Sequence, residues 1–174
     1  NHPAWGTTSV PVGEWHHLAA TYNGSCWSLY FDGNIDTLNG SATACPSATP
    51  ESTSYQHPGI AAALNSTGGL ATGYFAGTID EARVWDHALL QGEIQTNKNL
   101  EITSASGLLA RWGMNEGSGT TTSSSVGTFP GTITNGPLWV SGFPIPDSTP
   151  PAAPTNLQAT SGNSLVDLSW TAPP

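Results

Sequence analysis

Basic residues are almost absent from this chain of 174 residues. Three Lys and Arg residues face twelve Asp and Glu residues, so the formal net charge is −9. Nucleic-acid binding needs clustered Lys and Arg to neutralise phosphates, and attraction to an anionic membrane surface needs the same charge. The composition therefore argues against a nucleic-acid partner and against a membrane-surface partner.

Long apolar runs are also missing. No stretch approaches the ~20 consecutive apolar residues that a membrane helix needs, so we expect no membrane insertion. What the chain has instead is 20 Gly and 14 Pro, which is typical of short strands joined by turns or linkers. Seven Trp residues supply a large apolar surface, which argues against disorder.

Cysteine is scarce, with one residue on each side of a strong turn signal. Cys26 and Cys45 flank the Asp32-Gly33 pair, which is typical of a two-residue hairpin turn. A disulfide across this hairpin would place the protein in an oxidising compartment. The alternative is two separate buried thiols.

Short strands are predicted through most of the first hundred residues. Trp27 to Phe31 alternates with a period of two, and the Asp32-Gly33 turn leads into a return strand. The expected strands cover residues 17–22, 27–31, 34–38 and 59–65. Residues 74–85 are expected to hold a pair of strands, and a helix of about two turns is expected over residues 88–97. Residues 40–57 have no periodicity and are predicted to form a long loop.

Two segments carry a family resemblance. The first is Trp15-His-His-Leu-Ala-Ala-Thr-Tyr-Asn-Gly, and the second is Gly77-Thr-Ile-Asp-Glu-Ala-Arg-Val-Trp-Asp-His. They resemble the C-terminal half of a laminin G-like domain, which is an antiparallel, all-β, concanavalin A-like jelly-roll sandwich. The resemblance implies that residues 1–103 form this half of a domain and that the chain starts within it. It also implies a domain that binds or links rather than catalyses.

A later part of the chain, residues 104–146, resembles the opening strands of the same family. Its motif is Gly107-Leu-Leu-Ala-Arg-Trp-Gly-Met-Asn-Glu-Gly, followed by residues 131–140. Two alternatives stay open: residues 104–146 start a tandem repeat, or they fold back as closing strands of the first domain. In the second case we expect Gly107 to Trp112 to pair with the sheet that carries residues 74–85, with Leu108 and Trp112 buried.

The last segment resembles a different family. Residues 147–174 begin with a Pro-rich run and continue as Thr155-Asn-Leu-Gln-Ala-Thr and Leu165-Val-Asp-Leu-Ser-Trp170, like the first two strands of a fibronectin type III domain. A complete sandwich of this type needs roughly 100 residues. The resemblance therefore implies a linker and a truncated fibronectin type III sandwich, with Trp170 as a core residue.

Catalytic chemistry is not expected from the acidic pair Asp80-Glu81. Neighbouring residues of a strand point to opposite faces, whereas retaining glycosidases need two carboxyl groups about 5 Å apart. Glycosidases of this architecture carry a Glu-x-Asp-x-Glu strand, from which this chain departs. We predict no catalytic residues, and we expect Arg83 to pair with a carboxylate and hold the strand register.

A calcium ion is implied by the family resemblance. Ca²⁺ takes six to eight oxygen ligands, and the candidates here are Asp80, Asn115 and Glu116 with nearby loop carbonyls. Residues 122–127 lack the Asp that relatives often carry in the corresponding turn. The alternative is that these side chains are ordinary surface groups. The histidines show no spacing typical of a zinc site.

Exposed aromatics are the candidates for ligand contact, because binding on such scaffolds usually lies in loops. Tyr55, in the long loop, and Trp5 are the two predicted to be exposed. The leading functional prediction is a non-catalytic extracellular or cell-surface module that binds carbohydrate or an extracellular protein, or serves adhesion, within a larger modular protein. The alternatives are an accessory module of an extracellular polysaccharide-degrading enzyme and a filament-forming repeat that self-associates through exposed strand edges.

Overall fold

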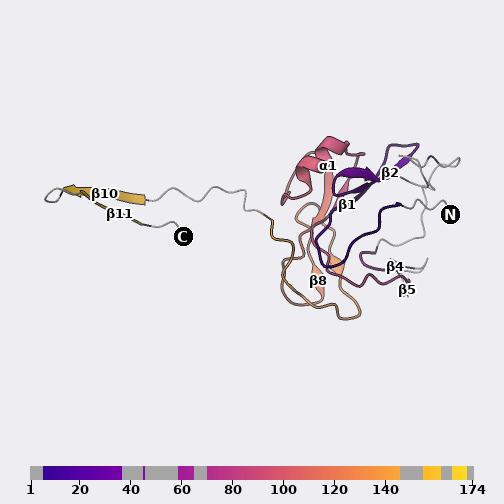
Figure 1. Ribbon diagram of the computed structural model, residues 1–174. Coiled ribbons are helices and arrows are strands. Elements are labelled where there is room, and N and C mark those ends of the chain that lie inside the picture. The colour runs from indigo at the N-terminus through magenta and orange to yellow at the C-terminus, as the bar shows by residue number, and fades with distance from the viewer. Residues whose placement is uncertain are drawn as a thin grey trace.

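The computed structural model describes residues 6–36, 45, 59–64, 70–145, 155–161 and 166–171. The described part contains antiparallel sheets and one short helix (Figure 1). No helix within these ranges is long and apolar enough to cross a bilayer. The chain is therefore mostly β, in agreement with the predicted fold class.

The largest sheet has the strand order β1-β2-β3, built from Leu18–Tyr22, Trp27–Phe31 and Asn34–Asp36. The predicted hairpin turn joins the last two strands. Asp32 and Gly33 have φ of 51° and 79°, as a two-residue turn that matches strand twist requires. Tyr30 is the buried residue of β2. Local turn chemistry therefore explains the register of this sheet.

A second sheet joins two segments that lie far apart in the sequence. β6, Ala82–Trp85, pairs antiparallel with β7, Leu108–Trp112. The expected pairing of these segments is confirmed, and Leu108 and Ala110 are buried. Trp112 is half-buried rather than buried, and its indole N–H donates to the carbonyl of Phe129 at 2.7 Å.

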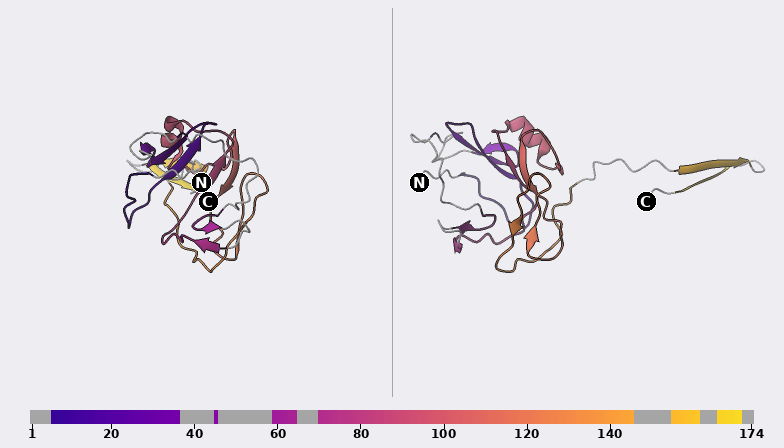
Figure 2. Two further views of the ribbon diagram at one scale, coloured as in Figure 1. Left: turned by 90° about the vertical axis from the view of Figure 1, so that its right-hand side faces the viewer. Right: turned by 180° about the vertical axis from the view of Figure 1, so that it is seen from behind.

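Three further pairs of short strands complete the described part. They are β4 with β5 (Ala63–Leu64 and Leu70–Thr72), β8 with β9 (Thr121–Thr122 and Gly131–Thr132), and β10 with β11 (Thr155–Ser161 and Val166–Thr171). The β10–β11 hairpin lies apart from the other strands, as Figures 1 and 2 show. The side chain of Trp170 lies outside the described part, so its expected core role stays a prediction.

Residues 74–85 hold one strand rather than the predicted pair, because residues 74–81 are not strand residues and β6 begins at Ala82. Glu81 has φ of 54°, in the left-handed region, and its N–H donates to the Asp80 carboxylate at 3.0 Å. This local bond turns the backbone away from an extended path. The strand expected from residue 59 likewise begins later, at Ala63 in β4, since Ala61 has φ of 65°.

The helix α1, Gln91–Asn97, is shorter than the predicted range of residues 88–97. The Glu93 carboxylate accepts a hydrogen bond from the N–H of Leu90 at 2.7 Å, as an acid at the third helical position commonly does. This cap starts the helix after Leu90. Ile94, which is 2 % exposed, anchors it to the core.

Candidate functional site

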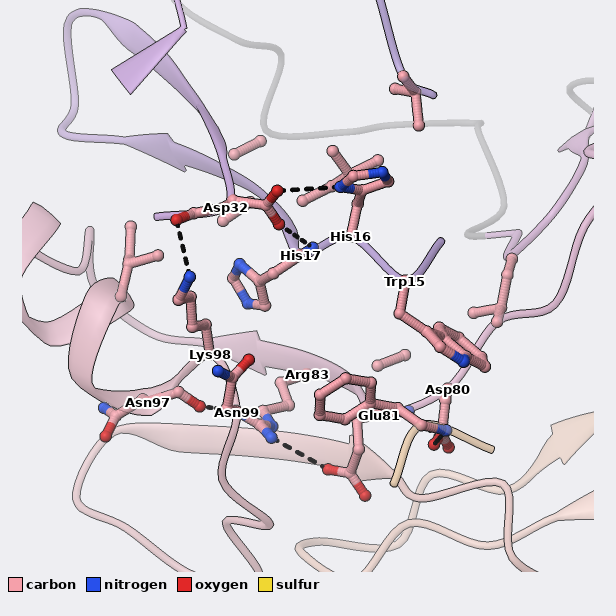
Figure 3. Close-up of a pocket in the computed structure, with 18 of the residues that line it drawn as sticks. Trp15, His16, His17, Asp32, Asp80, Glu81, Arg83, Asn97, Lys98 and Asn99 are labelled. Atoms are coloured by element: carbon pink, nitrogen blue, oxygen red, sulfur yellow. Dashed lines mark hydrogen bonds and ion pairs between the residues drawn. The ribbon is translucent and has the colours of Figure 1, made fainter. Parts of the chain in front are cut away.

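An open groove of about 1440 Å³ lies between the β1 side of the first sheet and the segment that leads into β6. Residues 141–145 and the end of α1 contribute the remaining walls (Figure 3). Its lining is largely apolar, with Trp15, Leu18, Phe75, Val84 and Phe143 among the contributors. A concave apolar surface with a few polar groups is the usual form of a binding site.

Trp15 is one of the exposed aromatic residues that line this groove. Its side chain is on the groove wall, and the residue is 38 % exposed. Its ring packs edge-on against Phe143, with centroids 6.1 Å apart and an interplanar angle of 76°. This contact fixes the orientation of the indole, because edge-to-face pairs are the favoured aromatic geometry.

The Asp80 carboxylate closes one end of the groove. One oxygen accepts a hydrogen bond from the N–H of Phe143 at 2.8 Å, and the other accepts from the N–H of Glu81. A Cβ added at Gly142 would lie 2.3 Å from an Asp80 oxygen, so only glycine allows this close approach. Asp80 therefore ties residues 141–145 across the groove.

Glu81 points into a separate charged cluster on the β6–β7 sheet. Arg83 Nη2 donates to it at 3.2 Å and Arg111 Nε at 2.9 Å, with a second, short contact from Arg111 Nη2. Arg111 also donates to Glu101 at 2.7 Å. The expected pairing of Arg83 with a carboxylate is confirmed. Asp80 and Glu81 thus face different partners, although Glu81 is not a strand residue.

Burial alone would lower the pKa of Arg111, since it disfavours the charged guanidinium. The hydrogen bonds and negative charge of Glu81, with help from Glu101, outweigh this effect and raise the pKa. Arg83 additionally donates to the carbonyls of Asn97 and Leu100. The cluster therefore joins β6, β7 and the segment after α1 through ion pairs and hydrogen bonds.

A third polar group surrounds Asp32 at the hairpin turn. Its carboxylate accepts from the N–H of His17 at 2.8 Å and lies 2.9 Å from His16 Nδ1. Its carbonyl accepts from Lys98 Nζ at 3.1 Å. Partial burial would raise the pKa of Asp32, but the hydrogen bonds from His16 and His17 lower it. The turn is thereby fastened to β1 and to the helix end.

The Cys26–Cys45 disulfide is present, which confirms the predicted bridge. The other sequence-predicted site residues fare differently. Tyr55 and Trp5 lie outside the described residues. Trp15 and Phe143, which line the groove, were not among the expected ligand contacts, and the Trp15-His16-His17 run was the signal nearest to them.

Two of the three expected calcium ligands, Asp80 and Glu116, bind different partners, and the third, Asn115, is exposed. Asp80 binds the backbone at Glu81 and Phe143, whereas the Glu116 carboxylate accepts from the Thr122 hydroxyl at 2.9 Å. A second bond, from the N–H of Ser123 at 2.7 Å, also holds Glu116. Burial opposes ionisation of Glu116, but these bonds outweigh it and lower the pKa. Within the described ranges, no three His, Cys, Asp or Glu residues are grouped to hold a metal.

The described residues therefore do not form a preassembled calcium site, and calcium binding stays a prediction from the sequence. If Ca²⁺ binds the folded state alone, it raises the unfolding midpoint in proportion to ln(1 + [Ca²⁺]/Kd). The measurement is a thermal melt in EDTA and then in excess Ca²⁺. A rise that is lost in Glu116→Gln would support the site, and an unchanged midpoint would contradict it.

A family model described as the concanavalin A-like lectin/glucanases superfamily matches residues 2–95. This match covers more than half of the chain and includes β1, β2, β3 and β6. The chain belongs to this superfamily. No curated protein and no solved structure matches it.

Proposed function

We propose that this chain is a non-catalytic, extracellular or cell-surface module that binds a carbohydrate or protein ligand in the groove beside Trp15. The observation that carries the proposal is the open groove, with an exposed indole on its wall. Membership of a lectin/glucanase superfamily supports a carbohydrate-related role. The disulfide supports an oxidising, extracellular setting.

The hydrogen bonds that Asp80 and Glu81 accept support a binding function rather than catalysis. A general acid or base must exchange a proton with its substrate. Glu81 is held by two arginines, and Asp80 is held by two backbone N–H groups. These partners favour the ionised carboxylates, so proton uptake by either one would weaken the bonds that it accepts.

Trp15→Ala should weaken ligand binding by tenfold or more, about 1.4 kcal/mol, because it removes the exposed indole from the groove wall. A glycan array on the native chain identifies the ligand, and calorimetry then compares the variants. Tyr74→Ala is the matched control, since Tyr74 is a 63 % exposed aromatic outside the groove lining. Circular dichroism checks that each variant keeps its fold.

Equal affinity for Trp15→Ala and the native chain would contradict the groove as the binding site. If the array shows no binding at all, the carbohydrate form of the proposal fails. A protein ligand would then be the form that remains to be tested.

We also propose that the structural domain extends beyond the family match to residue 145. β7 lies outside the matched range, yet it supplies Leu108, Ala110 and Arg111 to the buried sheet. These contacts support the fold-back alternative for residues 104–146. The proposed fibronectin type III start at residues 147–174 is supported by the antiparallel pairing of β10 with β11.

Two alternative functions, self-association and an accessory module of an enzyme, can each be tested by a separate observation. Self-association is favoured by β1, which is the outer strand of its described sheet and carries Leu18, 62 % exposed. Concentration-dependent sedimentation of the purified chain would support this function. A hydrolase domain encoded beside this sequence would favour the accessory-module alternative.

A further inference from the structure

His17 lies at the joint between three elements of the fold. Its N–H donates to the Asp32 carboxylate at 2.8 Å, and its carbonyl accepts from the N–H of Asp32 at 2.8 Å. The imidazole projects toward Lys98 and Arg83, as Figure 3 shows. The residue therefore has its backbone fixed to the hairpin turn and its ring directed at the helix end and β6.

The helix α1 is held to the same hairpin by side-chain contacts. Lys98 Nζ donates to the Asp32 carbonyl at 3.1 Å, and Gln91 Nε2 donates to the Gly33 carbonyl at 3.3 Å. Gln95 reaches the Asn34 side chain at 3.5 Å. Since Lys98 is the charged member of this set, its position is the one most sensitive to a new charge nearby.

The charges that face His17 come from every side of this joint. Arg83 on β6 and Lys98 after α1 are both cationic, and Asp32 is the one acid among the groups that act on it. That acid is also engaged by its neighbour His16 at 2.9 Å. Glu81, the acid that pairs with Arg83, is also bound by Arg111.

The surroundings of the His17 ring do not favour its protonated form. Among the described residues, His17 Nδ1 is a buried atom without a hydrogen-bond partner. A protonated imidazole needs an acceptor at each nitrogen, and a buried, unpaired charge is costly. Burial first, and then Arg83 and Lys98, lower the pKa of His17 from its ordinary value of 6.5.

We propose that His17 is a pH-sensitive latch that holds α1 against the β2–β3 turn while its ring is neutral. Protonation places a third positive charge beside Arg83 and Lys98, and it displaces Lys98 from the Asp32 carbonyl. The helix end then separates from the turn. Because Asn97, Lys98 and Asn99 line the groove, acid loosens one of its walls. This inference does not depend on the identity of the groove's ligand.

The direction of the effect follows from proton linkage. The open state binds a proton with the ordinary pKa of 6.5, whereas the closed state binds it more weakly. The latch is therefore fully effective above pH 6.5 and is lost progressively as the pH falls below that value. The ratio of open to closed forms should rise by up to about tenfold per pH unit.

Hydrogen exchange of residues 91–99 between pH 7.5 and pH 5, corrected for intrinsic exchange rates, tests the latch. The native chain should lose protection below pH 6.5, and His17→Gln should show a flat profile. His87→Gln is the matched control, because His87 is an exposed histidine beside Asp86, and it should behave like the native chain.

A flat native profile would overturn the proposal, and so would a loss of protection that persists in His17→Gln. If His17→Gln does not fold, histidine NMR of the native chain decides the matter. The His17 signal should titrate below pH 6.5, and the backbone signals of α1 should shift with the same midpoint. Helix signals that ignore the His17 midpoint would also overturn the latch.

Discussion

Glu81→Gln should lower the free energy of unfolding by about 3–5 kcal/mol, the range for removing one partner of a buried ion pair. The Glu81 side chain is 11 % exposed and that of Arg111 is 6 % exposed, so water cannot replace the lost charge. The variant leaves two guanidinium groups with weakened partners in the β6–β7 sheet. Urea unfolding measures the effect, with the slope checked for constancy.

Glu101→Gln is the matched control for this prediction. Glu101 also binds Arg111, at 2.7 Å, but its side chain is 48 % exposed. Exposed pairs contribute about 0–1 kcal/mol, so the control should lose much less stability. Similar losses for both variants would show that burial does not decide the strength of this cluster.

Removing the disulfide should produce the other large effect. Cys26 and Cys45 are 19 residues apart in sequence, and closing a loop of about that length contributes about 3 kcal/mol in the chain-entropy model. The variant Cys26→Ala with Cys45→Ala should therefore melt roughly 10 °C lower than the native chain. Differential scanning calorimetry provides the midpoint.

Chemical reduction is the control for the disulfide prediction. A reductant should lower the midpoint of the native chain to that of the double variant and leave the double variant unchanged. Mass spectrometry after alkylation establishes the redox state of each sample. Two alkylated thiols in the unreduced, denatured native chain would show that the bridge does not form in solution.

Local patterns predicted much of the first sheet. The period of two in Trp27–Phe31 and the Asp32-Gly33 turn signal both reappear in the structure. A two-residue turn fixes register through the conformation of its own residues, so it needs little information from the rest of the chain. The disulfide could be proposed from the sequence for a related reason, because the two cysteines flank that hairpin.

Strand length near Asp80 could not be derived from the same patterns. The sequence pattern favoured a pair of strands within residues 74–85, but Asp80 binds the N–H of Glu81 and turns the chain. Its second oxygen binds Phe143, which lies 63 residues further along. Such a bond depends on where a distant segment passes, and periodicity carries no information about that.

Patterns along the chain predicted the mostly β fold class, the hairpin and the pairing of Arg83 with an acid, and they left the disulfide as one of two alternatives. The contacts between residues that are far apart in the sequence became known from the packing of the elements. Glu81 binds Arg111, and the groove combines Trp15 with Phe143. The physical reason is that side-chain contacts of this kind are set by the packing of whole elements, whereas sequence patterns report the neighbours of each residue along one strand or helix.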